Sequence, residues 1–201
     1  QRQMCIRDRF MTPAIKKYNG FIDKYIGDAV MALFPTSAED AVLAAVEMNK
    51  QLAIYNSDEP TSGKDPVNMG VGIHIGQLVL GTIGRELRME TTVISDTVNA
   101  SARLENLNKT YKTNVLISGA VRDELSPDIQ RFCRLIDRTQ VKGKVEFLDV
   151  YEVYLTDDEL LAEAKSKSKK VLTSIVDSYY LGDIKAAKKI LGELEDDTKK
   201  D

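Results

Sequence analysis

The chain has 201 residues, 43% of them hydrophobic, and a net charge of -3, so it can bury one core and carry a small second module. This charge gives no general attraction to nucleic acid or to an anionic membrane surface, and we expect neither as a partner. No apolar run approaches the roughly eighteen residues that a membrane-spanning helix needs. We therefore expect a cytoplasmic location, although a longer parent chain could carry a membrane anchor.

Residues 1–9 show neither an apolar period nor the hydrophobic region of a signal peptide. We interpret them as a non-native or disordered leader and exclude them from the fold argument. The two cysteines, Cys5 and Cys133, are far apart and lack metal-ligand spacing. This pattern favours reduced structural thiols over a disulfide framework or a zinc site.

The first predicted elements are a helix over residues 10–19, ended by Gly20, and a β-hairpin over residues 21–34. Apolar, β-prone residues flank Gly27-Asp28 on both sides, which is typical of a two-residue turn with a positive backbone dihedral. Such a turn would hold the Asp28 carboxylate rigidly at the end of a sheet. Aspartate also suits a tight turn without any chemical role, so the turn alone leaves both interpretations open.

Residues 38–56 carry apolar positions at helical spacing and predict an amphipathic helix. A loop rich in Asp, Ser, Gly and Pro then extends to residue 66. Apolar alternation over residues 69–81 predicts a second hairpin that turns near Ile75-Gly76. Its glycines lack the spacing of dinucleotide or P-loop motifs, which favours turns and bulges over a phosphate loop. His74 has no second histidine with which to share a metal ion.

Residues 91–94 predict a short strand, and Ser95-Asp96 should cap a helix over residues 97–108. Asn99 and Arg103 are four residues apart on this helix, so their side chains project from the same face. A solvated helix face and a ligand-binding face are both compatible with this pair.

The next segments are a strand at residues 115–117, a short helix at 120–125 and an extended piece at 134–137. A last hairpin follows, with its turn at Lys142-Gly143-Lys144 and its returning strand at residues 147–154. Two lysines beside a glycine could contact an anion or could belong to a solvated turn.

Beyond residue 155 the sequence becomes charged and helical in period, and two apolar stripes separated by a Gly-Asp turn predict two antiparallel helices. Part of this segment resembles a tetratricopeptide repeat, through Gly182, Ala187 and Leu191. A single repeat cannot bury its own apolar face, so it would pack on the preceding domain or begin a longer array. An ordinary structural helical hairpin is the alternative.

Four motifs together resemble the catalytic domain of class III nucleotidyl cyclases. They follow the family's order and approximate spacing: FIDKYIGDAVMALF, GVGIHIGQLVLGTIG, RMETTVISDTVNASARLE, and VKGK with YEVY. The resemblance implies an α+β fold with a ferredoxin-like βαββαβ core that lacks its first strand here. It implies three parts: the leader at 1–9, a truncated cyclase catalytic domain at 10–155 and a helical extension at 156–201. Because the first strand is central in the family, its loss should leave two strands without a partner.

The resemblance implies an adenylate cyclase, which converts ATP to cyclic AMP and pyrophosphate by attack of the ribose 3′-hydroxyl on the α-phosphorus. Two divalent cations, Mg²⁺ or Mn²⁺, would lower the pKa of the hydroxyl and neutralise phosphate charge. Asp28 matches one of the family's two metal-binding aspartates. The other has no counterpart, because Asp8 lies in an Arg-Asp-Arg context without strand character.

The resemblance assigns the remaining site residues to the nucleotide. Lys24 and Thr92 match the pair that selects the purine: the lysine donates to a ring acceptor of adenine, and the hydroxyl can accept from the exocyclic amine. Family members that select guanine usually carry glutamate in place of this lysine, so we expect ATP over GTP. Asn99 matches the residue that orients the ribose, and Arg103 and Lys144 match the residues that hold the phosphate charge.

Spacing and resemblance together predict a homodimer with shared active sites. Lys24 and Asp28 would lie about 13 Å apart along one hairpin arm, which is long for a single purine-to-metal contact. Family members build each site between two chains, with Asp28 of one facing Asn99 and Arg103 of the other.

Because the second aspartate is missing, we expect these 201 residues alone to bind metal-nucleotide weakly and not to cyclise it. The alternative hypothesis is a cyclase-like module that has lost catalysis and serves in nucleotide binding or dimerisation.

Overall fold

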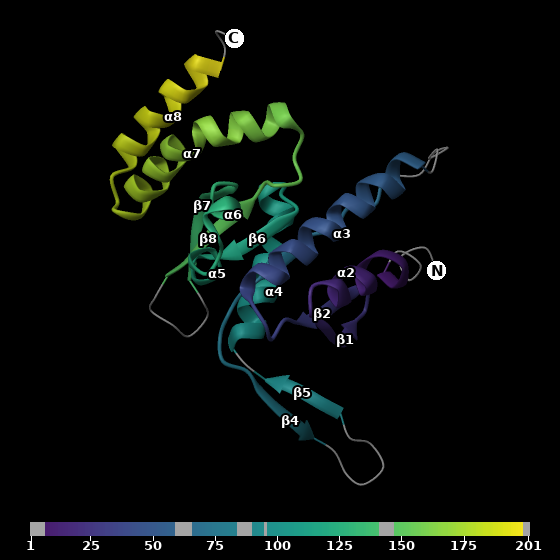
Figure 1. Cartoon of the computed structure of the whole chain (residues 1–201). Helices are drawn as coiled ribbons and strands as arrows, with labels where there is room; N and C mark the ends of the chain where they lie inside the picture. Colours follow the sequence, from purple (N-terminus) through teal and green to yellow (C-terminus); the bar gives the residue numbers. More distant parts are fainter. Residues whose placement is uncertain (1–6, 59–65, 84–89, 95, 141–146, 199–201) are drawn as a thin grey trace.

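The computed structural model describes residues 7–58, 66–83, 90–94, 96–140 and 147–198. The N-terminal half contains a helical entry, two hairpins and a long helix: η1 (Arg7–Met11), α2 (Thr12–Lys17), β1 (Phe21–Ile26), β2 (Ala29–Leu33), α3 (Ala38–Asp58), β3 (Val71–Ile73), β4 (Val79–Ile83) and β5 (Glu90–Ile94). The C-terminal half continues with α4 (Asp96–Tyr111), β6 (Val115–Ser118), α5 (Gly119–Asp123), α6 (Pro127–Gln130), β7 (Cys133–Gln140), β8 (Phe147–Val153), α7 (Glu159–Tyr180) and α8 (Ile184–Thr198). Figure 1 shows their arrangement.

The entry helix α2 ends at Lys17, before the predicted glycine. Asn19 is the residue in the left-handed region, with φ of 59°, and the Gly20 N–H donates to the Ile15 carbonyl at 2.9 Å. Gly20 is needed for a different reason, because a Cβ there would lie 2.5 Å from the Phe34 ring. The glycine therefore permits close packing of the hairpin, and asparagine supplies the helix end.

A four-stranded sheet forms the centre of the molecule, in the order β3-β6-β8-β7. β3 runs parallel to β6, and β8 runs antiparallel to both β6 and β7. The side chains of β6 alternate between two cores: Val115 and Ile117 face one, and Leu116 faces the other. Helices therefore cover both faces of this sheet.

The larger core lies between the sheet and helices α2 and α3, where Ile15, Val42 and Ala45 are buried together with Val115 and Ile117. The smaller core lies on the opposite face, where Leu104 of α4 packs against the sheet. The β1–β2 hairpin adds partly buried apolar side chains to the larger core. Helix α4 and the β1–β2 hairpin therefore contribute to different cores on the two faces of the same sheet.

The predicted second hairpin over residues 69–81 is wrong. β3 joins the central sheet beside β6, whereas β4 pairs antiparallel with β5 in a separate two-stranded arm that projects from the rest of the molecule (Figure 1). The physical reason is at Gly72, where a Cβ would lie 2.3 Å from the backbone of α4 at Ser101 and Glu105. The lack of a side chain at Gly72 thus lets β3 lie directly beneath α4, where it pairs with β6.

Six strands pair on one side only within the described residues: β1, β2, β4 and β5 in the two-stranded sheets, and β3 and β7 at the edges of the central sheet. β2 pairs with β1 alone, and β3 pairs with β6 alone. The expectation that loss of the first strand leaves two strands without a partner stays a prediction, with β2 and β3 as the strands concerned. The order of elements from α2 to β3, helix, two strands, helix and strand, follows the predicted ferredoxin-like core without its first strand.

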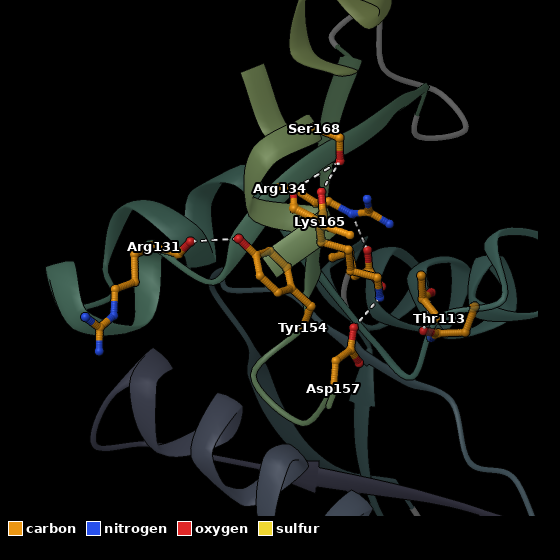
Figure 2. Close-up of polar contacts among 10 residues, drawn as sticks. Thr113, Arg131, Arg134, Tyr154, Asp157, Lys165 and Ser168 are labelled. Atoms are coloured by element: carbon orange, nitrogen blue, oxygen red, sulfur yellow. Dashed lines mark hydrogen bonds and ion pairs between the residues drawn. The ribbon is translucent and has the colours of Figure 1, made fainter. Parts of the chain in front are cut away.

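The C-terminal helices form the predicted antiparallel hairpin, with Gly182 at φ of 81° in the turn. Lys165 of α7 attaches the helix to the central sheet through an ion pair with Glu152 of β8 at 2.6 Å, and it also contacts Asp157; within the sheet, Arg134 of β7 contacts Glu152 at 2.5 Å. Figure 2 shows Lys165 directed at the sheet beside Arg134 and Asp157. The tetratricopeptide resemblance of this hairpin stays a prediction. No helix in the described part of the chain combines the length and apolarity required to cross a bilayer.

Candidate functional site

Asp28 occupies the two-residue turn that the sequence predicted. β1 and β2 pair up to Ile26 and Ala29, so Gly27 and Asp28 alone connect them. Gly27 has φ of 62°, a value that glycine adopts without strain. The Asp28 side chain is exposed at the tip of the hairpin, where its carboxylate is available to a ligand.

Lys24 lies on the same hairpin, opposite Met31. The register shifts between Ile22 and Lys24, which leaves Asp23 in a bulge. The Asp23 side chain is 5% exposed, and its Oδ2 atom lies 3.3 Å from Lys24 Nζ. That oxygen has no hydrogen bond within the described residues, so the Lys24 ammonium supplies its nearby positive charge. Sequence reasoning missed Asp23, although the adjacent opposite charges within an apolar strand were a visible signal.

Asn99 and Arg103 project from the exposed face of α4, one turn apart, as predicted. The helix is held by Leu104, which is fully buried, and by Asn108 Nδ2, which donates to the Val71 carbonyl at 3.0 Å. Arg103 Nη1 donates to the Gln140 carbonyl at the end of β7. The arginine is therefore held against the last residue of that strand.

The two other residues predicted to contact the nucleotide are Thr92 and Lys144. Thr92 lies on β5 and pairs with Gly81 in the β4–β5 arm. Lys144 lies outside the described residues, in the segment that directly follows Gln140 in the chain. Neither prediction is tested by a contact in the structure.

The structure brings the predicted residues together in two groups. Lys24 and Asp28 share the β1–β2 hairpin, and Asn99 and Arg103 share α4. Within the described residues, no hydrogen bond or ion pair joins one group to the other.

A metal ion needs several ligand side chains close together. Among the side chains that the structure describes, no three His, Cys, Asp or Glu residues lie close enough to hold a metal ion. Asp28 supplies one carboxylate, whereas hard divalent cations take several oxygen ligands. The described residues therefore do not complete a two-ion site.

Two other candidate groups have structural roles. The Cys133 thiol is buried and free, and burial raises its pKa to about 11, so it is not a nucleophile near neutral pH. His74 Nδ1 lies 2.8 Å from Ser118 Oγ, and this contact joins the end of β3 to the end of β6. The burial of Cys133 agrees with its interpretation as a reduced structural thiol.

The chain is similar to known proteins over most of its length. Residues 13–157 match the family model of the adenylate and guanylate cyclase catalytic domain. An adenylate cyclase of Anabaena cylindrica is 43% identical over 149 residues, which are 71% of this chain and 30% of that protein. The terminal-differentiation specific adenylate cyclase of Dictyostelium discoideum is 41% identical over 152 residues, 72% of this chain and 7% of that protein. The chain thus spans less than a third of either relative.

The same fold is found among solved structures. The guanylyl cyclase Cya2 superposes with a TM-score of 0.63 at 30% identity, over 76% of this chain and 78% of that one.

Proposed function

Because the chain belongs to the family of adenylate and guanylate cyclase catalytic domains, we propose that it is the catalytic domain of an adenylate cyclase. It converts ATP to cyclic AMP and pyrophosphate. The observation that carries the proposal is the pairing of Asn99 with Arg103 on one exposed face of α4, in a chain whose hairpin presents Lys24 and Asp28. The names of the two curated relatives agree with it.

The proposed reaction is an in-line displacement at the α-phosphorus: the ribose 3′-hydroxyl gives up its proton to solvent, its oxygen bonds to the phosphorus, and pyrophosphate leaves as the bond to the bridging oxygen breaks. Asn99 orients the ribose so that its hydroxyl faces the phosphorus. Arg103 and Lys144 hold the negative charge of the phosphates with charge-assisted hydrogen bonds. Each of these residues lowers the barrier by positioning or by charge, and none needs to form a covalent bond.

Purine choice rests on Lys24 and Thr92. The lysine donates to a ring nitrogen of adenine, and the threonine hydroxyl accepts from the exocyclic amine. Guanine presents an N–H and a carbonyl at those positions, so a lysine donor would face a donor. The bulge at Asp23 supports this role, since it places a carboxylate 3.3 Å from Lys24 Nζ and so helps to hold the ammonium in position.

Catalytic domains of this family use divalent metal ions, which lower the pKa of an attacking hydroxyl and neutralise phosphate charge. We infer that Asp28 is one ligand for Mg²⁺ or Mn²⁺. The described residues do not supply the second carboxylate. The unpaired edges of β2 and β3 support a further strand between them, followed by that ligand, in a longer chain.

Family members act as dimers and bind a nucleotide. We propose a homodimer in which Asp28 of one protomer faces Asn99 and Arg103 of its partner. Within the described residues of one chain, no hydrogen bond or ion pair joins Lys24 or Asp28 to Asn99 or Arg103, and this supports the arrangement. The hairpin also exposes apolar side chains near Asp28, with Tyr25 46% and Ile26 58% exposed, as an interface would require.

The direct test measures cyclic AMP and cyclic GMP formation by the longest natural chain that contains these residues, with Mg²⁺ and with Mn²⁺. We expect cyclic AMP as the product and loss of activity in Asp28→Ala and Arg103→Ala. The 201-residue chain should bind ATP weakly and form no cyclic AMP. Robust cyclic AMP formation by that chain would contradict our view of the metal site.

The second candidate function is a module that binds a nucleotide or dimerises without catalysis. The single carboxylate found for a metal site within the described residues favours it. Binding of ATP by the longest natural chain without product, under both metals, would support this candidate over the enzyme.

A further inference from the structure

One carboxylate on β7 joins two helices that are distant in sequence. The Tyr111 hydroxyl of α4 donates to Asp137 Oδ2, and the Tyr180 hydroxyl of α7 donates to Asp137 Oδ1 at 2.9 Å. The Tyr180 hydroxyl also contacts the Arg138 carbonyl oxygen. Asp137 lies beside an irregularity in the β7–β8 register, which turns its side chain to a position that both tyrosines reach.

A second contact joins α7 to the same part of the sheet. Arg138 Nη2 donates to Asp177 of α7 at 2.6 Å, and Arg138 Nε donates to Asp149 of β8 at 2.8 Å. The Tyr180 ring packs on Phe147, the first residue of β8, with ring centroids 5.3 Å apart. The last turn of α7 is therefore bonded to β7 and packed on β8.

Arg103 lies against the same stretch of β7. Its Nη1 atom donates to the Gln140 carbonyl, three residues after Asp137. Arg103 and Tyr111 are eight residues apart on α4, about 12 Å along the helix axis. Two hydrogen bonds thus attach α4 to β7: one from Tyr111 to Asp137, and one from Arg103 to Gln140 about two turns away along the helix.

We propose that Tyr180 and Asp177 of the C-terminal helix α7 are positioning residues for Arg103. They fix β7 at Asp137 and Arg138, and β7 in turn fixes the strand end on which the arginine rests. We call this set of contacts the β7 clasp, made by Tyr111, Asp137, Arg138, Asp177 and Tyr180. The inference rests on the proposed function, in which Arg103 holds the phosphate charge.

The clasp gives the C-terminal helices a role beyond covering the sheet. If α7 only stabilised the fold, loss of one hydroxyl would weaken all ligand contacts and the melting temperature together. If α7 positions Arg103, the same loss falls selectively on the phosphates. The distinction can be measured, because ATP carries the phosphates and adenosine does not.

The test uses Tyr180→Phe, which removes the hydroxyl and keeps the ring on Phe147, and Asp177→Asn, which removes the charge. Tyr179→Phe is the matched control, since that neighbouring tyrosine is 58% exposed. Calorimetric titration of the 201-residue chain with Mn²⁺-ATP and with adenosine gives two affinities per variant. We expect Tyr180→Phe to weaken ATP binding about tenfold and adenosine binding less than about twofold, with the control unchanged.

A double-mutant cycle makes the test specific to Arg103. In an Arg103→Ala background, Tyr180→Phe should cause no further loss of ATP affinity. An equal loss in both backgrounds, or an equal loss for ATP and adenosine, would overturn the proposal. A wild-type chain that binds ATP while the longest natural chain forms no cyclic AMP would contradict the proposed reaction and leave this cycle interpretable.

Discussion

At the scale of single residues, the pairing of Lys24 with Asp23 links purine choice to a backbone irregularity. The bulge turns Asp23 inward until its side chain is 5% exposed and leaves Lys24 33% exposed beside it. A buried carboxylate needs an adjacent cation, so the two residues depend on each other. A change at either position therefore affects both the fold of the hairpin and the charge offered to a base.

Lys24→Glu should reverse the preference for the base. We expect kcat/KM for ATP to fall on the order of 100-fold, and kcat/KM for GTP to fall less or to rise, because glutamate accepts from guanine and cannot donate to adenine. Steady-state kinetics with both nucleotides measure this. Asp23→Asn is the control for loss of the ion pair, and an equal fall for both nucleotides in Lys24→Glu would contradict the assignment.

Ionisation of Tyr180 makes the free energy of unfolding depend on pH in the alkaline range. Burial, followed by its hydrogen bond to Asp137, raises the pKa of Tyr180 from 10.0 to about 12, and the same causes raise the pKa of Tyr111. The folded state thus favours the neutral phenol. The contribution is complete below pH about 10 and is lost as the pH rises towards about 12.

Urea unfolding at a series of pH values between about 10 and about 12 should therefore show a falling free energy of unfolding. Tyr180→Phe should make that fall shallower, since it removes one of the phenols whose pKa is raised in the folded state, and Tyr179→Phe should keep the wild-type slope. A wild-type slope in Tyr180→Phe would show that the Tyr180 hydroxyl does not carry the effect.

At the scale of secondary-structure elements, α7 is held by buried charge. Glu152 is 2% exposed and accepts from Arg134 at 2.5 Å and from Lys165 at 2.6 Å. Lys165 also contacts Asp157. One ammonium therefore contacts two carboxylates between the helix and the sheet, and its loss would leave Glu152 with Arg134 alone and remove the ion pair of Asp157.

Lys165→Met should lower the free energy of unfolding by about 3 kcal/mol, because the buried Glu152 loses one of its two cations. Lys167→Met is the control on the same helix: its ion pair with Glu163 is exposed, and we expect a change within about 0.5 kcal/mol. Chemical denaturation of both variants provides the comparison. Similar values for the two would show that the buried network adds no stability.

Several elements could be predicted from local pattern. The amphipathic period of α3, the capping residues before α4 and the turn at Gly27-Asp28 each depend on neighbours within a few residues. The pairing of β3 could not be predicted, since alternation shows which residues form a strand and not which strand lies beside it. The structure resolves this through Gly72, whose contact with α4 comes from a distant segment.

The residues of the candidate site also divide into those that a local pattern predicts and those that only the tertiary fold brings together. Asn99 and Arg103 were predictable as a pair, since helix geometry alone puts them on one face. The β7 clasp was not predictable, because Tyr111, Asp137 and Tyr180 come from three segments that only the tertiary fold brings together. Lys144 lies outside the described residues, and its role stays a prediction.

At the scale of the whole molecule, the separation of the hairpin residues from the α4 residues predicts complementation between chains. Asp28→Ala and Asn99→Ala should each be inactive alone in the longest natural chain. Mixing them should restore about a quarter of wild-type activity, because half of the dimers are mixed and each has one intact site. The readout is cyclic AMP formation after co-refolding, and no recovery in a verified mixed dimer would exclude shared sites.

The unpaired edges of β2 and β3 also bear on how the protein behaves in a test tube. β2 has the uncharged sequence Ala-Val-Met-Ala-Leu, and its free backbone groups can template the addition of a strand from any chain nearby. Concentrated preparations of these residues should therefore self-associate and precipitate. A short peptide of strand-forming sequence that occupies the edge would act as a solubilising additive, by the strand-donation mode that chaperones use for pilins.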